Sequence, residues 1–348
     1  MNRQFPALRG LAISLVVLYH SIDMGTLAPR GLGYPPVEGW GRYVLLVFHQ
    51  LGVFAVPTFL FISGCFAAYA ARGTPPQLSW KTIWAGLKRI LLPYLLWSIL
   101  FYILIYVRRN ETYTILGYVK NLLVGYPFHF VPILVFFYVI SPLLVPLASR
   151  FGALLIGLIA IYQLILLNIL SPGILGFVFP ERMQLLVPPA VGSTMAQWGI
   201  YFPLGLVYSL NAKRVKPWLD KAKWGLAAAT VAFFVLSVLH SADLIHLPLA
   251  SYICPLTFIL LAPLIKRNSI PLVRRLEEIG KRSYGLYLTH LIVLDLVFLV
   301  LQVTVPWVLA YQILLQPLLF ATAMGIPLLV MNGIARSPAR SVQRYVFG

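Results

Sequence analysis

Residues 8–21, LRGLAISLVVLYHS, form a stretch that is apolar at almost every position but contains Arg9 and His20. The stretch lies within a longer apolar run, residues 6–27, whose length predicts a helix that crosses a membrane. Ionisable residues inside such a helix are costly, so they indicate a functional site. Arg9 and His20 are about three helical turns apart, which predicts that both face one interior path, separated by roughly 16 Å along the helix axis.

The whole chain of 348 residues has the composition of a multi-pass membrane protein. It is 60% hydrophobic and only 10% charged, whereas soluble domains carry about 25% charged residues. No small-residue cleavage site follows the first apolar run, so we interpret it as a retained span rather than a signal peptide. Cys65 and Cys254 both lie in apolar runs, which indicates buried thiols rather than a disulfide or a metal site.

Apolar segments long enough to cross a bilayer recur along the chain and predict an all-α bundle of about ten transmembrane helices. We expect a single transmembrane domain over residues 1–348. A shorter apolar stretch, 113–125, predicts a half-span or an interfacial helix. The ten segments lie near residues 6–27, 44–70, 86–107, 128–148, 152–170, 193–210, 224–241, 248–265, 284–305 and 308–334.

The basic residues are divided unequally between the two sets of loops that these segments define. Of the 27 Lys and Arg residues, 21 fall in one set and 6 in the other. Loops rich in positive charge stay in the cytoplasm, so both termini are predicted to be cytoplasmic. The net charge of +18 therefore indicates topology and contact with anionic lipid headgroups rather than nucleic-acid binding.

Several side chains near the first two spans are candidates for chemistry. His20 is the candidate general base, because imidazole accepts a proton near neutral pH. Asp23 follows it by three residues and either orients the imidazole or is an interfacial anion. Ser63, beside Gly64 in FLFISGCF, is either a nucleophile or part of a close helix contact. No metal-ligand spacing occurs, so no metal site is predicted.

A basic pair and a lone carboxylate mark two further spans. Lys88 and Arg89 open the third span, where they either set its orientation or receive the phosphates of a nucleotide-containing donor. Asp295 lies near the middle of the ninth span, so it needs a partner there or belongs to the site.

Five motifs, in this order along the chain, resemble those of the integral-membrane acyltransferase-3 family, and the resemblance covers essentially the whole sequence. The order of all five is more specific than any one of them. At Val131, Pro132, Leu134 and Val135 the chain departs from the Trp and Glu that many members carry, which resembles the intercellular-adhesin type. The motifs are LRGLAISLVVLYHS (8–21), VPTFLFISGCF (56–66), LKRILLPYLLW (87–97), HFVPILVFFYVISPLL (129–144) and GKRSYGLYLTHLIVL (280–294).

The resemblance implies a membrane-bound O-acyltransferase of the cell (cytoplasmic) membrane. It would move an acyl group, acetyl or succinyl, from cytoplasmic acyl-CoA to a hydroxyl of a cell-surface or lipid-linked carbohydrate, as in O-acetylation of polysaccharides. Arg9, Lys88 and Arg89 would bind the acyl-CoA donor, and His20 would act as general base or carry the acyl group transiently. No permanently bound cofactor is implied, and polysaccharide synthase or export proteins would be partners.

Four further residues match motif positions and are expected to line the substrate cavity: His129, Tyr138, Tyr284 and His290. Two other functions fit a ten-span bundle with broken helices and buried charges. One is a transporter or flippase of polysaccharide or lipid-linked sugar, although no internal repeat of the kind common in transporters is apparent. The other is a membrane scaffold subunit without catalysis.

Overall fold

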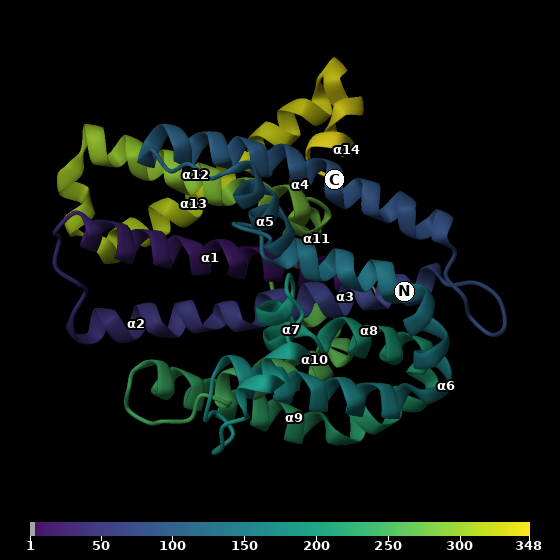
Figure 1. The fold of residues 1–348 in the computed structure, drawn as a ribbon. Coiled ribbons are helices and arrows are strands. Elements are labelled where there is room, and N and C mark those ends of the chain that lie inside the picture. The colour runs from purple at the N-terminus through teal and green to yellow at the C-terminus, as the bar shows by residue number, and fades with distance from the viewer. Residues whose placement is uncertain (1–3) are drawn as a thin grey trace.

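The computed structural model describes residues 4–348, and all of its named elements are helices (Figure 1). Seven are long and apolar enough to cross a membrane, which confirms the all-α polytopic class. The number of crossings and the side of the termini stay predictions. The seven are α1 (Phe5–Gly31), the continuous run Gly39–Ala70, α4 (Trp80–Arg109), α6 (Phe130–Leu170), α9 (Ala212–Ser241), α12 (Ser283–Thr304) and α13 (Gln312–Arg336).

The run Gly39–Ala70 consists of α2 (Gly39–Gln50), the 3-10 turn η1 (Leu51–Phe54) and α3 (Ala55–Ala70). The shorter helices are α5 (Ile115–Val124), α7 (Gly192–Trp198), α8 (Tyr201–Leu210), α10 (Ala250–Leu261), α11 (Val273–Lys281) and α14 (Gln343–Val346). Further 3-10 turns are η2 (Glu181–Leu186), η3 (Ala262–Leu264), η4 (Arg267–Ser269), η5 (Pro306–Ala310) and η6 (Pro338–Val342).

α6 contains two of the segments expected from the sequence, 128–148 and 152–170. Phe151 interrupts the helix with non-helical backbone angles, φ −124° and ψ 36°. Gly152 follows directly, and glycine is permissive where a helix must bend. The chain turns back at this bend, toward the right of Figure 1, so the two halves of α6 run in different directions.

Two helices in highly charged stretches of the sequence, α9 and α11, differ from the segments predicted from hydropathy. α9 begins at Ala212 rather than near 224, because its basic first turns continue the helix beyond the apolar run. The expected loop 266–283 contains α11, which hydropathy misses because its sequence, VRRLEEIGK, is highly charged. Arg267 Nε donates to Glu277 Oε1 at 2.5 Å, and this hydrogen-bonded cation lowers the pKa of the Glu277 carboxyl.

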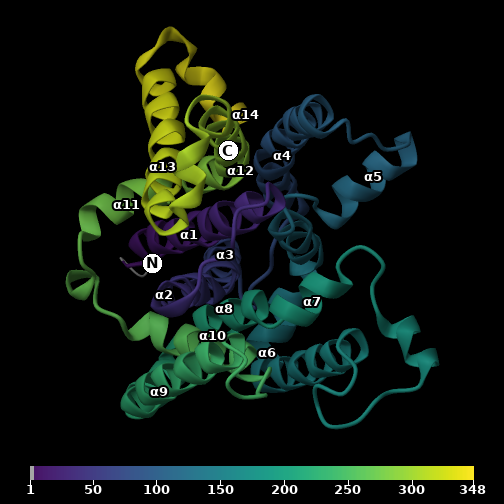
Figure 2. The ribbon, with the colours of Figure 1, turned by 90° about the vertical axis from the view of Figure 1, so that its left-hand side faces the viewer.

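α1 is the central helix of the bundle. It packs against α11 and α13 on one side and against α3 and α12 on others, as the view along the bundle shows (Figure 2). Apolar side chains of α1, such as Phe5, Ile13 and Val17, are fully buried in the main core. Helices therefore surround much of α1, and its buried side chains face protein rather than lipid.

Gly64 and Gly205 bring α3 and α8 into close contact. A Cβ atom added to Gly64 would overlap the carbonyl oxygen of Phe202, and one added to Gly205 would overlap that of Phe61. Small residues at such positions let helix backbones approach. The motif that contains Ser63 and Gly64 therefore includes a helix contact, which was one of its two interpretations.

Replacing Gly64 with alanine is expected to destabilise the protein by about 1–3 kcal/mol, because the added methyl group meets rigid backbone. Thermal unfolding of the purified protein in detergent measures this effect. Gly157→Ala is the matched control, since Gly157 is also helical and a Cβ there meets nothing within 4 Å. Equal stability of the two variants would contradict the close contact.

Candidate active site

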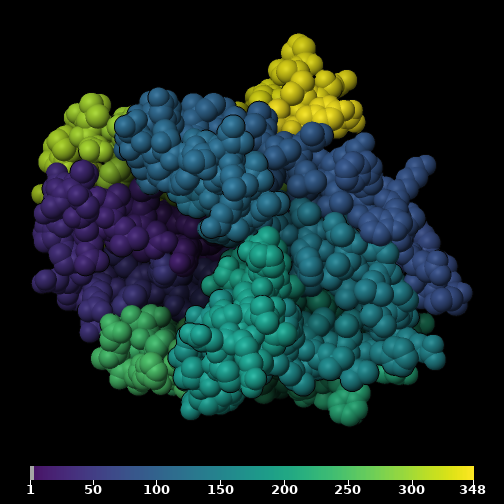
Figure 3. Space-filling view, viewed as in Figure 1, coloured from purple at the N-terminus to yellow at the C-terminus, as the bar shows by residue number. Residues whose placement is uncertain are grey.

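His20 lies on a wall of a cavity of about 400 Å³, which we call the histidine cavity. Figure 3 shows the surface hollowed at the centre of this face, where purple N-terminal atoms lie between blue and teal segments. The cavity is lined from α1, η1, α3, the start of α6, α7, α10 and α12. Its polar and aromatic lining residues are Tyr19, His20, His129, Gln197, Trp198, Ser251, Tyr252 and Tyr287.

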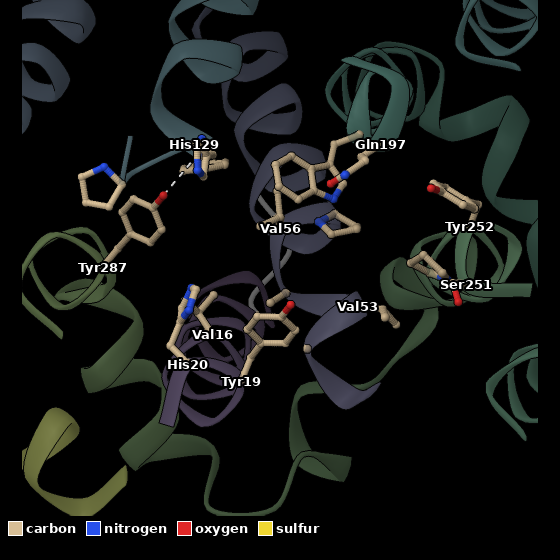
Figure 4. Close-up of a pocket in the computed structure, with 17 residues that line it drawn as sticks. Val16, Tyr19, His20, Val53, Val56, His129, Gln197, Ser251, Tyr252 and Tyr287 are labelled. Atoms are coloured by element: carbon tan, nitrogen blue, oxygen red, sulfur yellow. Dashed lines mark hydrogen bonds between the residues drawn. The ribbon is translucent and has the colours of Figure 1, made fainter. Parts of the chain in front are cut away.

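The His20 imidazole has aromatic neighbours on two sides. Its ring centroid is 5.1 Å from that of Tyr19, edge to face, and 5.3 Å from that of His290. Figure 4 shows His20 and Tyr19 together on one side of the cavity and His129 and Tyr287 close by. Because His20 faces this hollow, a reacting hydroxyl in the hollow can reach the imidazole.

His290 lies behind His20 and is fully buried. Its Nδ1 is 3.1 Å from the carbonyl oxygen of Leu286, and a carbonyl only accepts, so Nδ1 carries a proton. Its Nε2 has no hydrogen-bond partner in the part of the chain that the structure describes. His290 therefore presents an unused nitrogen near His20, without lining the cavity itself.

His129 reaches the histidine cavity from just before α6. It is exposed, and its Nδ1 lies 3.3 Å from the carbonyl oxygen of Val124. Tyr287 stands near it, where the Tyr287 hydroxyl accepts a hydrogen bond from the backbone N–H of Phe130 at 3.2 Å. The structure thus brings His20, His129 and His290 together from three separate motifs.

Asp23 does not orient His20. Its Oδ1 instead accepts a hydrogen bond from His49 Nε2 at 3.0 Å. The His49 ring stacks on Tyr19, with centroids 4.1 Å apart and planes at 28°. Asp23 therefore binds the imidazole of His49 on α2 rather than that of His20, three residues before it on α1.

Arg9 lies on α1, about three turns from His20, and is half-buried. Its Nη2 donates to the hydroxyl of Ser283 at 2.9 Å, and its guanidinium lies 6.0 Å from the ring centre of Phe66. Within residues 4–348, no carboxylate forms an ion pair with it. A half-buried cation with only neutral partners favours an anionic ligand.

The Lys88–Arg89 turn of α4 is joined to the same end of α12 as Arg9. Tyr284, next to Ser283, donates from its hydroxyl to the carbonyl oxygen of Ile90 at 2.6 Å. The side chains of Lys88 and Arg89 are exposed, and Lys88 lies over the ring of Trp84 at 5.5 Å. Tyr284 thus links α12 to α4 and does not line the histidine cavity.

Neither Ser63 nor Tyr138 lines the histidine cavity. Tyr138 lies within electrostatic range of Arg9, and its ring centre is 6.0 Å from that of Phe202. Ser63 is half-buried on α3, beside the helix contact at Gly64. Tyr138 therefore belongs to the surroundings of Arg9, three turns from His20.

A family model described as Acyltransferase domain matches residues 2–332, nearly the whole chain. The chain belongs to the acyltransferase-3 family. No curated protein and no solved structure is significantly similar to it. The protein is therefore a multi-pass membrane acyltransferase.

In this acyltransferase, Asp295 forms an ion pair with Arg108 at the end of α4. Arg108 Nη1 is 2.9 Å from Asp295 Oδ1 and also donates to the Asp295 backbone carbonyl at 2.9 Å. Arg109 lies farther from the same oxygen, at 3.4 Å. Asp295 is 4% exposed. The carboxylate thus ties α12 to the end of α4 and lies outside the histidine cavity.

Sequence reasoning missed much of the far wall of the acyltransferase's cavity. Gln197 and Trp198 come from α7, and Ser251 and Tyr252 from α10. These residues carry no local signal, because only the packing of distant segments brings them to His20. Tyr287, by contrast, lies inside the motif that contains Tyr284 and His290, and its spacing of one turn from His290 is the signal that could have found it.

Proposed function

We propose that the protein is an acyl-CoA-dependent O-acyltransferase that acylates a hydroxyl of a cell-surface or lipid-linked carbohydrate. The acyl group is acetyl or succinyl, and the enzyme works in the cytoplasmic membrane, alongside polysaccharide synthase or export proteins. The observation that carries the proposal is the arrangement on α1: His20 faces a cavity, and Arg9, which has no anionic partner among residues 4–348, lies three turns away.

Arg9 and His20 suit the two ends of acyl-CoA, which are its phosphates and its thioester. Arg9, with Lys88 and Arg89 on the adjoining turn of α4, would hold the phosphates of acyl-CoA. The long pantetheine arm would then carry the thioester toward His20. A cavity of about 400 Å³ suits a short acyl group and the end of that arm rather than a whole CoA molecule.

The chemical step needs one base and no net proton exchange with solvent. His20 takes the proton from the acceptor hydroxyl as its oxygen attacks the thioester carbonyl carbon. The new carbon–oxygen ester bond forms, the carbon–sulfur bond breaks, and His20 passes the proton to the departing sulfur, so CoA leaves as a thiol. Tyr19 and His290 confine the imidazole while this happens.

The decisive experiment supplies radiolabelled acetyl-CoA or succinyl-CoA to vesicles that contain the purified protein and extracted surface glycans. Incorporation of label into glycan supports the proposal, and mass spectrometry of the product identifies the acyl group and its carrier. Movement of glycan across the vesicle membrane without acyl transfer would instead identify a transporter.

Replacing Arg9 with alanine is expected to weaken acyl-CoA binding about ten- to a hundredfold, since it removes charge-assisted hydrogen bonds to phosphate. Isothermal calorimetry on the purified protein measures the dissociation constant. Arg150→Ala is the matched control, because Arg150 is exposed and its guanidinium lies 5.0 Å from the ring centre of Phe151. Unchanged affinity in Arg9→Ala would contradict the assigned donor site.

A further inference from the structure

A second hollow of about 740 Å³ lies between the last turns of α1 and α2, together with the segment that leads into α2. We call it the polar vestibule. Unlike the histidine cavity, it is lined by several charged side chains from both helices and by one glutamine from α13. Its polar lining includes Asp23, Arg30, Glu38, Arg42, His49 and Gln312.

The charges of the polar vestibule balance. Arg30 and Arg42 line it together with Asp23 and Glu38, so neither sign dominates. Asp23 is already bound by His49, and Arg42 lies 3.6 Å from Asp243 outside the vestibule lining. Within residues 4–348, Arg30 and Glu38 form no ion pair. A hollow with unpaired donors and acceptors but no net charge favours a neutral ligand with many hydroxyl groups.

Gln312 gives an independent sign of a ligand. Its side chain is 3% exposed, and its Nε2 donates to the carbonyl oxygen of Pro35 at 2.7 Å. Its Oε1 is buried and has no hydrogen-bond partner. Leaving a buried acceptor unpaired is costly, and rotation of the Gln312 amide, which lines the vestibule, would let a ligand hydroxyl there satisfy it.

The polar vestibule adjoins the candidate active site through two stacked rings. His49 lines the vestibule and Tyr19 lines the histidine cavity, and their ring centroids are 4.1 Å apart. Tyr19 in turn contacts His20. A chain of sugar units held in the vestibule therefore lies one ring pair away from the reacting imidazole.

We propose that the polar vestibule binds the non-reacting sugar units of a neutral carbohydrate acceptor. Arg30 donates to their hydroxyl oxygens, whereas Glu38 and the Oε1 of Gln312 accept from their hydroxyl groups. This site assignment rests on the proposed acyl transfer, since it names the part of the acceptor that is held away from the chemistry. Binding energy from such remote units positions the reacting hydroxyl.

The test compares Arg30→Gln and Glu38→Gln with Arg182→Gln and Glu181→Gln. The control pair is exposed on η2 and lies outside the vestibule lining. The probe is the surface glycan extracted from cells that lack the protein, titrated in vesicles with acetyl-CoA. We expect each vestibule variant to raise the KM for glycan about tenfold or more. Its release of free CoA in the absence of glycan should stay unchanged, because neither side chain is assigned to the donor.

Three outcomes separate this inference from the proposed function. A wild-type KM in both vestibule variants would overturn the vestibule site while acyl transfer stands. Tighter glycan binding by Glu38→Gln would overturn the neutral class and indicate an anionic acceptor. If the wild-type protein transfers no acyl group, the proposed function fails, and saturation-transfer NMR between glycan and protein still decides whether the vestibule binds it.

Discussion

Replacing His20 with alanine is expected to lower the rate of acyl transfer by about 10²–10⁴-fold, the usual contribution of a positioned general base. The loss should appear in kcat, because the imidazole acts on the proton that moves in the transition state. Radiolabel transfer from acyl-CoA to glycan in reconstituted vesicles measures it. Acyl-CoA affinity should change little, since Arg9 lies about three helical turns from His20.

The matched control for this variant is His246→Ala. His246 lies in the short segment between α9 and α10, where its ring contacts that of His240 at the end of α9. It does not line the histidine cavity. Both proteins must insert in the membrane and show wild-type thermal unfolding for the comparison to hold. A stable His20→Ala enzyme with wild-type transfer would remove His20 from the mechanism.

Replacing Arg108 with alanine is expected to destabilise the protein by about 3–5 kcal/mol, because Asp295 would be left buried without its main cation. The side chains of Arg108 and Asp295 are 16% and 6% exposed, so solvent screens the pair little. Within residues 4–348, Asp295 Oδ2 has no hydrogen-bond partner, and the half-exposed Arg109 would be the one cation left near Oδ1. Thermal unfolding in detergent measures the loss.

Arg109→Ala separates this effect from a general loss of charge. Arg109 is half-exposed and 3.4 Å from the same oxygen, so its removal should shift unfolding much less. The double variant Arg108→Met with Asp295→Leu should recover stability, since two apolar side chains replace the ion pair and no buried charge is left unpaired. Equal losses in both single arginine variants would show that the ion pair does not act as described.

The first helix shows how much of this site follows from sequence. The apolar run and the spacing of Arg9 and His20 depend only on helical geometry and the low polarity of a bilayer, so α1 was predictable. Its central place in the bundle came only from the structure, where its apolar residues are buried on several sides. The helical class of the fold follows from the same pattern, repeated along the chain.

Asp23 shows where the same reasoning stops. Pairing with His20 was one of two interpretations of Asp23, but α2 brings His49 Nε2 to within 3.0 Å of the Asp23 carboxylate. Nothing local in the sequence reports that contact, because it depends on how two helices cross. The partners of Asp295 and the walls contributed by α7 and α10 have the same origin.

The stack of Tyr19 on His49 has a consequence for the fate of the donor under the proposed function. A thioester is reactive, and water competes with a sugar hydroxyl for attack on its carbonyl carbon. One ring borders the wide polar vestibule and the other borders the histidine cavity. The two rings thus close the direct route from the vestibule to the donor, so that water reaches the thioester only through the opening of the histidine cavity itself.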